Sequence, residues 1–295
     1  MNKKLISKIS MTAIPALLLL VFFTGCAVKS TAVWGDPDTG LILKYRMAEG
    51  QVLTYESSDY KSEVNEVMGQ EYETETTGTS KISFKSVGMK EGAHQLETTV
   101  EDMSLDIESP QMNLSPDLSP VIGKSFVMSL SSLGEELDVS GAEGLEYELG
   151  PIGNRNLLIT FQIFFPNLPE NPIKVGESWT STYTIDDKSA SMSINVTLES
   201  VNTVDGFEII DGLECVRINA DVRGTVGGEG SQEGAKLDIQ GQLTGADTWY
   251  FAYKEGVYVS MISNASVDVT IEVSGPVTMT IPGTQEIQSE LKLVK

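Results

Sequence analysis

The stretch "VDVTIEV", residues 267–273, alternates apolar and polar side chains without interruption. Its four apolar residues share one parity, and its two acids and its threonine share the other. Side chains of one parity point to the same face of an extended strand, so the stretch predicts a strand with one buried and one solvated face. Clean alternation of this kind is typical of antiparallel sheets, in which one face packs on a core and the other meets water.

The same pattern recurs along most of the chain. Further segments that alternate are "VRINADV" (216–222), "LDIQGQL" (237–243), "VTMTI" (277–281), "IQSELKL" (287–293), "VLTYESSDYKSEV" (52–64), "YETETTGTSKISFKSV" (72–87) and "HQLETTVEDMSLDI" (94–107). In the last of these the apolar parity changes between Val100 and Met103, which predicts a β-bulge near Asp102. Turn dipeptides such as "DG" and "EG" separate the segments. The sequence therefore predicts an all-β chain.

Four pairs of segments echo one another in the same order, with offsets between 114 and 126 residues. The pairs are "GQVLTY" (50–55) with "GESWTS" (176–181), "ISFKSV" (82–87) with "VTLESV" (196–201), "EGAHQLETTV" (91–100) with "DGLECVRINA" (211–220), and "FVMSLSSLGEELDVS" (126–140) with "WYFAYKEGVYVSMIS" (249–263). A repeat spacing of this size predicts two tandem antiparallel β-meander units that form a half-barrel or a barrel-like shell. The first unit would span residues 41–150 and the second residues 176–295.

A connector of different composition, residues 151–175, lies between the two units. Its apolar run from Leu157 to Phe165 is followed by Pro166 and two further prolines. Asn154 or Asn156 is suited to cap a short helix that Pro166 would end, and the prolines then favour an extended linker. A buried strand is the alternative, since short apolar runs do not distinguish the two. We expect one short central helix.

The first 25 residues predict a cleaved signal peptide. Lysines precede an apolar stretch that is short for a membrane span, and "FTGC" follows it. The triplet ending in Cys26 resembles a bacterial lipobox, which predicts that Cys26 is lipidated and that residues 26–40 form a lipidated tether. A plain signal peptide with an incidental cysteine is the alternative. Ala27 after the cysteine favours the outer membrane if the source has two membranes.

Composition excludes several function classes. The formal net charge is −22, from 20 basic and 42 acidic residues, which disfavours binding of nucleic acid. His94 is the single histidine, and we expect it to lie in a surface turn and not to act as a catalytic base. With Cys26 lipidated, Cys215 has no partner for a disulfide. It lies off the apolar parity of its strand, and an inert thiol, which is the commoner case, is favoured over a reactive one. The scarcity of His and Cys predicts no zinc-type metal site, and we expect no cofactor and no enzymatic activity.

Four segments together resemble a known group of proteins: "GQVLTYESSDYKSEV", "FPNLPENPIKVGESWT", "GFEIIDGLECVRI" and "GADTWYFAYKEGVYVSM". They resemble a family of uncharacterised bacterial lipoproteins whose members share a proline, a short gap and V-G-[DE]-x-W. More distantly, the layout is similar to the LolA/LppX-like half-barrel lipoproteins. That resemblance implies a long curved antiparallel sheet wrapped around a helix or a lipid, and it supplies no catalytic residues.

The aromatic residues of the connector and the second unit are the candidate binding residues. They are Phe161, Phe164, Phe165, Trp179 and Trp249. We expect a non-enzymatic envelope protein that is held to the membrane by its N-terminal lipid and binds a hydrophobic or amphipathic ligand in a concave β-sheet. The alternative is a structural or protein-interaction module of the envelope, with an unknown protein partner and a fully packed core.

Overall fold

The computed structural model describes residues 34–150, 153–188, 192–232, 234–276 and 278–294. The predicted signal peptide, Cys26 and most of the predicted tether lie outside these residues. Residues 32–295 form one unit by their internal contacts. Within the described residues, no helix combines the length and the apolar character that a membrane span requires.

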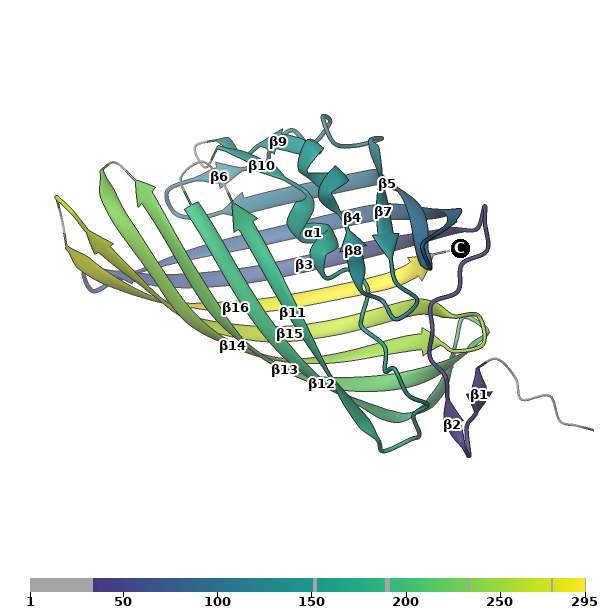
Figure 1. Ribbon diagram of the computed structural model, residues 1–295. Helices are drawn as coiled ribbons and strands as arrows, with labels where there is room; N and C mark the ends of the chain where they lie inside the picture. Colours follow the sequence, from purple (N-terminus) through teal and green to yellow (C-terminus); the bar gives the residue numbers. More distant parts are fainter. Residues whose placement is uncertain (1–33, 151–152, 189–191, 233, 277, 295) are drawn as a thin grey trace, which may run out of the picture. The chain divides into compact units, whose positions relative to one another are not determined.

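Long antiparallel strands make up most of the described chain (Figure 1). The strands are β1 (Gly35–Asp36), β2 (Gly40–Leu41), β3 (Val52–Val67), β4 (Gln70–Lys90), β5 (Ala93–Glu108), β6 (Asn113–Leu114), β7 (Ser125–Leu130), β8 (Glu136–Asp138), β9 (Glu146–Glu148), β10 (Asn154–Asn156), β11 (Ser178–Lys188), β12 (Met192–Ile210), β13 (Leu213–Gln232), β14 (Ala235–Ala252), β15 (Val257–Ser274) and β16 (Met279–Val294). A 3-10 helix spans Ser140–Gly144, and the α-helix α1 spans Leu158–Gln162.

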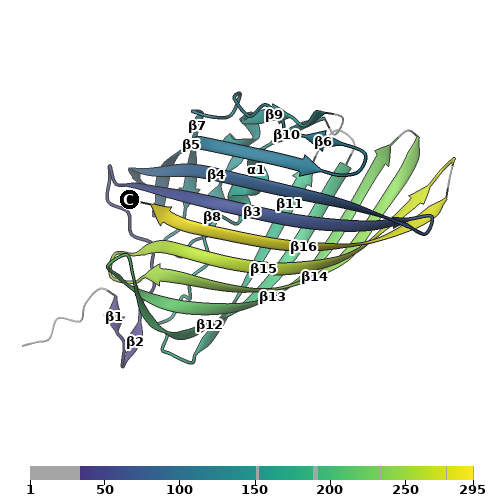
Figure 2. The same cartoon turned by 180° about the vertical axis from the view of Figure 1, so that it is seen from behind.

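Twelve of the strands form one open sheet in the order β11-β12-β13-β14-β15-β16-β3-β4-β5-β7-β8, with β6 also paired to β5. The first meander consists of β3, β4, β5, β7 and β8, and the second consists of β11–β16. The last strand, β16, pairs antiparallel with β3, so the two meanders are joined side by side. The sheet curves around the connector, which carries α1 on the concave side (Figures 1 and 2). The expected all-β half-barrel with one short central helix is confirmed, and the sheet does not close.

Burial alternates along the strands as the apolar and polar residues do in the sequence. In β15, Val267 is buried on the concave face, whereas Asp268 and Glu272 are exposed on the convex face. The predicted bulge in β5 is also confirmed, because Lys81 pairs with Asp102 while Ile82 pairs with Val100. Glu101 is therefore the extra residue, and it keeps the apolar side chains on both sides of it on one face of the sheet.

The echo of "GQ" (50–51) and "GE" (176–177) has a structural basis in two equivalent turns. Gln51 N donates to Ala48 O at 2.9 Å, and Glu177 N donates to Lys174 O at 3.1 Å. The glycine before each donor has a positive φ, 82° and 85° respectively. This position in a type II turn requires a positive φ, which glycine adopts without strain.

The side chains of the two echoed residues also have the same role. Gln51 Oε1 accepts from Ala48 N at 3.0 Å, and Glu177 Oε2 accepts from Lys174 N at 2.9 Å. In both meanders the residue after the turn glycine also bonds to the second strand, at Ser86 and at Val204. The echoed stretch is thus a turn that starts a meander.

The predicted helix is short, and it begins one residue later than capping by Asn156 predicts, because its N-cap residue is Leu157. Asn156 Oδ1 accepts from Leu158 N at 3.0 Å, which satisfies one of the free N–H groups at the start of α1. The helix ends at Gln162, four residues before Pro166. Gln162 then fixes the connector to the edge strand β11: its Nε2 donates to Asp186 O at 3.2 Å, and its Oε1 accepts from Asp186 N at 3.0 Å.

The solid core lies under the connector, where both meanders contribute side chains. Its largest fully buried residues are Tyr45, Tyr55, Phe84, Phe161, Phe165, Phe251 and Tyr258. Edge-to-face ring contacts link several of them, including Tyr45 with Phe251 at 5.2 Å between ring centroids. The two meanders therefore share one hydrophobic core.

Candidate functional site

Beyond the solid core, the concave face of β11–β16 carries a cavity of about 690 Å³. Its lining is mostly apolar and includes Ile194, Val196, Leu198, Val226, Ile239, Leu243, Val267, Val269 and Ile271. Ile163, Phe164 and Pro166 of the connector close it from one side. The cavity exists because one stretch of connector covers the wide sheet only in part, and the core residues fill only the covered part.

Strand register arranges the concave side chains into rows that cross the sheet. One row is polar and consists of Asn202, Asp247, Ser263 and Ser289, with Ala220 of β13 between the first two. These four residues are called the polar row below, and all four line the cavity. The row on one side of it belongs to the core and contains Ile218, Trp249, Met261 and Leu291. Apolar rows follow on the other side, such as Leu198, Leu243 and Val267.

Small residues leave room between the apolar rows. Gly245 and Ala265 stand opposite each other on β14 and β15 and both line the cavity. A Cβ on Gly245 would lie 3.1 Å from the Ala265 Cβ and 3.0 Å from the Asn264 carbonyl oxygen. A larger side chain at either position would therefore fill cavity space or push the strands apart.

Asp247 is the carboxyl at the centre of the polar row. Burial raises its pKa, and a hydrogen bond with the Ser263 side chain opposes that shift. Among the described residues, no ion pair involves Asp247. Tyr183 and Tyr258 also line the cavity, and the Asp247 charge contributes to raising the pKa of both.

Glu63 is the second carboxyl at the cavity, and it is paired. Burial alone would raise its pKa, but Lys61 and a hydrogen bond from Asn65 outweigh that effect and leave the pKa below its usual value. Lys61 Nζ lies 3.0 Å from Glu63 Oε2, and Gln285 Nε2 donates to the same oxygen at 3.2 Å. Among the described residues that line the cavity there is no lysine, arginine or histidine.

The connector wall is held in place by hydrogen bonds from both meanders. Tyr45 Oη donates to Pro166 O at 3.0 Å, and Asn167 N donates to Tyr183 Oη at 3.0 Å. Phe165 N donates to Glu136 Oε1 at 2.7 Å, and burial raises the pKa of Glu136 to about 8. These hydrogen bonds fix the connector against the sheet, so the cavity is preformed.

The five aromatic candidates are divided between the cavity and its support. Phe164 and Trp249 line the cavity. Trp179 stacks edge-to-face on Trp249 at 5.9 Å, and its Nε1 donates to Asn167 O at 2.9 Å. Phe161 and Phe165 are fully buried in the solid core and do not line the cavity.

Sequence reasoning missed the polar row, although a signal for it exists. Asp247 has the parity of Leu243 and Trp249 in β14, so an acid at that position interrupts the apolar face. Ser263 and Ser289 interrupt their strands in the same way. The sequence shows each of these interruptions singly. That they form one row across the sheet is recognisable only once the strand pairing is known.

The expectation of a surface turn for His94 is wrong. His94 is buried at the start of β5, and its Nε2 lies 3.2 Å from Tyr45 O. The turn ends at Gly92, and His94 has the same parity as the buried Leu96 in β5, so its side chain points inward.

Cys215 is buried as well. Burial raises its pKa to about 11, which keeps the thiol protonated and unreactive at neutral pH. Among the described residues, no group of three or more His, Cys, Asp or Glu side chains is arranged to hold a metal ion.

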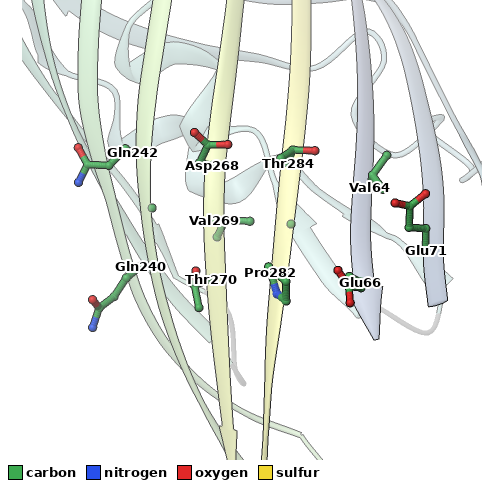
Figure 3. A pocket seen from close by; sticks show the side chains of 12 residues that line it. Val64, Glu66, Glu71, Gln240, Gln242, Asp268, Val269, Thr270, Pro282 and Thr284 are labelled. Atoms are coloured by element: carbon green, nitrogen blue, oxygen red, sulfur yellow. The ribbon is translucent and has the colours of Figure 1, made fainter. Parts of the chain in front are cut away.

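A second hollow, of about 670 Å³, lies on the convex face over β14, β15, β16, β3 and β4 (Figure 3). Figure 3 shows Glu66, Glu71 and Asp268 around it together with Gln240 and Gln242. These side chains belong to the solvated parity of their strands and are exposed. The described residues that line it are mostly acids, amides and threonines, with no lysine, arginine or histidine, and such a lining does not define a binding chemistry.

No family model and no curated protein matches this chain. Solved structures with a detectable likeness include Pseudomonas aeruginosa OccK2 in complex with glucuronate, with 7% identity, a TM-score of 0.31, and coverage of 84% of this chain and 100% of that one. Another is an outer membrane channel from Pseudomonas putida F1, with 10% identity, a TM-score of 0.23, and coverage of 85% and 97%. TM-scores this low assign neither a fold family nor a function. The cavity itself is therefore the basis for a functional assignment.

Proposed function

We propose that this protein is a lipid-anchored, non-enzymatic protein of the bacterial cell envelope that binds a hydrophobic or amphipathic ligand on its concave face. The observation that carries the proposal is the apolar cavity of about 690 Å³ between the sheet and the connector. Its volume is within the range of about 300–1,000 Å³ typical of small-molecule sites.

The composition of the cavity wall supports an apolar ligand. Transfer of acyl carbons from water to the apolar rows is favourable by roughly 0.8 kcal/mol for each buried CH₂ group. Most of the lining side chains belong to strands of one sheet, so binding orders little of the protein. The resemblance to the LolA/LppX-like half-barrel lipoproteins supports the same proposal.

Anchoring is proposed through Cys26, with the outer membrane as the expected location in a double-membraned source. Acyl chains on an N-terminal cysteine hold a protein at a membrane without any contribution from its fold. Fractionation of cells that express the chain or its Cys26→Ser variant tests this part of the proposal, since the variant should leave the membrane fraction.

Ligand binding is tested on the full chain in intact cells that have been fed a fatty acid bearing a photoreactive diazirine. The cell incorporates the label into its own lipids, so the ligand need not be known in advance. After irradiation, we expect adducts on the β14 and β15 peptides that line the cavity. Ala265→Phe places a ring in the cavity and should reduce these adducts about tenfold, a loss of roughly 1.4 kcal/mol in binding.

The matched control is Ala246→Phe, which adds the same ring on the exposed convex face of β14. This variant should give the adduct yield of the unmodified chain. Equal yields from the two variants would contradict the proposal. The alternative function, a structural or protein-interaction module, predicts no adducts on the cavity peptides in any of the three chains.

A further inference from the structure

We infer that the cavity selects amphiphiles whose polar end donates hydrogen bonds and carries no negative charge, such as a glycerol ester of a fatty acid. This inference rests on the proposed function and deepens it. It comes from the placement of the polar row and from the charges that face the cavity.

The polar row sets the orientation of the ligand. It lies between the core row that contains Trp249 and the apolar rows that contain Leu243 and Val267. A ligand with one polar and one apolar end therefore places its polar end against the row. Its chain then runs along β12–β15 toward Ile194, Ile239 and Ile271, which also line the cavity.

Within the row, Asp247 is the group with free capacity. Asn202 is already engaged: its Nδ2 donates to Ser181 Oγ and Ser200 O, and its Oδ1 accepts from Ser200 Oγ at 3.1 Å. The one hydrogen bond that affects the pKa of Asp247 is the bond with the Ser263 side chain. A carboxyl group has about four acceptor positions, so Asp247 retains positions for donors from a ligand.

Hydroxyl groups match this arrangement. Asp247 accepts a hydrogen bond from a hydroxyl, and Ser289, next to Ser263 in the row, either donates to a hydroxyl or accepts from one. A glycerol ester offers two hydroxyls at the end of a single chain. When the ligand binds, its hydroxyls lose hydrogen bonds to water and form hydrogen bonds to the polar row. No buried polar group is then left unpaired, so the cost of an unpaired group is avoided.

A ligand whose polar end is negatively charged would face carboxyl groups in this cavity. Among the described residues that line the cavity, the carboxyls are Asp247 and Glu63. Glu63 is already paired, since Lys61 Nζ lies 3.0 Å from its Oε2. A carboxylate or phosphate seated against the polar row would be removed from water next to Asp247 without a counter-ion. Such an arrangement is unfavourable because desolvation of the charge is not offset.

The test compares two brominated probes that differ only in the polar end: dibromostearoyl glycerol and dibromostearic acid. Bromine quenches tryptophan fluorescence at contact, and Trp249 lines the cavity. The mature, lipid-anchored chain is placed in lipid nanodiscs with Trp34→Phe as background, at about pH 9, where the fatty acid is ionised. Ala265→Phe serves as the blocked control.

We expect the glycerol ester to quench at a concentration at least about tenfold lower than the fatty acid. Asp247→Asn, which keeps the shape and removes the charge, should reduce that preference to about threefold or less. Equal quenching by both probes in the parent chain, with none in Ala265→Phe, overturns this inference and leaves the proposed function standing. Quenching by neither probe, or equal quenching in Ala265→Phe, contradicts the proposed function itself.

Discussion

At the scale of single residues, Glu136 shows how one side chain couples the connector to the sheet. Its carboxyl lies beside the chain at Phe164 and Phe165 and accepts the Phe165 N–H. Burial disfavours the ionised form, so the pKa rises to about 8. In the unfolded chain a glutamate titrates near 4.3. The folded state therefore binds a proton that the unfolded state releases across the interval between these two values.

This difference predicts that stability falls as the pH rises. The contribution of Glu136 is fully present below its unfolded pKa and is lost progressively as the pH increases through about 8. Glu136→Gln keeps an acceptor for Phe165 N but does not titrate. We expect the free energy of unfolding, measured with urea, to fall between pH 5 and pH 8. The decrease in the parent chain should exceed the decrease in the variant by about 1–3 kcal/mol.

The matched control for this measurement is Glu143→Gln, at an exposed position of the 3-10 helix. It should reproduce the pH dependence of the parent chain. Parallel pH profiles for the parent and Glu136→Gln would show that the carboxyl is ionised in the folded protein. Asp247, whose pKa is also raised, contributes equally to all three chains and does not obscure the comparison.

At the scale of elements, the two meanders begin with the same turn, and this turn can be tested for equivalence. Gly50 and Gly176 have φ values of 82° and 85°, and a Cβ on either residue would meet no atom within 4 Å. Alanine at these positions is strained by its backbone conformation alone. We expect Gly50→Ala and Gly176→Ala each to lower the free energy of unfolding by about 1–2 kcal/mol.

Gly206 provides the control for the turn glycines. A Cβ there also has open space within 4 Å, but its φ lies outside the left-handed region. Gly206→Ala should change the free energy of unfolding by no more than about 0.5 kcal/mol. Unequal costs at Gly50 and Gly176 would show that the two turns differ in strain, despite the hydrogen bonds that they share.

At the scale of the whole molecule, the β16–β3 pair and the shared core join the two meanders. Twelve residue pairs, from Gly283 with Asn65 to Val294 with Thr54, connect these strands. Tyr55 Oη also donates to Tyr258 O at 2.8 Å, which links β3 to β15 across β16. A contact network of this extent predicts that both meanders unfold together.

The measurement is urea unfolding followed by two probes. Far-ultraviolet circular dichroism reports the whole sheet, whereas tryptophan fluorescence is dominated by Trp179 and Trp249 of the second meander. We expect the two curves to share one midpoint within experimental error. Midpoints that separate would show that the meanders are independent cooperative units.

Local patterns determined the strands, the bulge and the turns from the sequence alone. Alternation in "VDVTIEV" fixes the direction of each side chain, because successive residues of a strand point to opposite faces. The parity change before Met103 located the bulge, and the asparagines before the apolar run placed the start of α1 to within a few residues. These features depend on residues within a few positions of one another, so a single sequence contains them.

Pairing over long distances was decided only by the tertiary structure. The register that places Asp247, Ser263 and Ser289 in one row depends on three strands, and the burial of His94 depends on a contact with Tyr45 far away in the chain. Phe161, Phe165 and Trp249 were all expected from the sequence to contact a ligand in the concave sheet. The sequence could not separate Phe161 and Phe165, which fill the core, from Trp249, which borders the cavity, because packing against the connector makes that choice. The sequence determined which face of each strand is apolar, and the fold decided where that face remains unfilled.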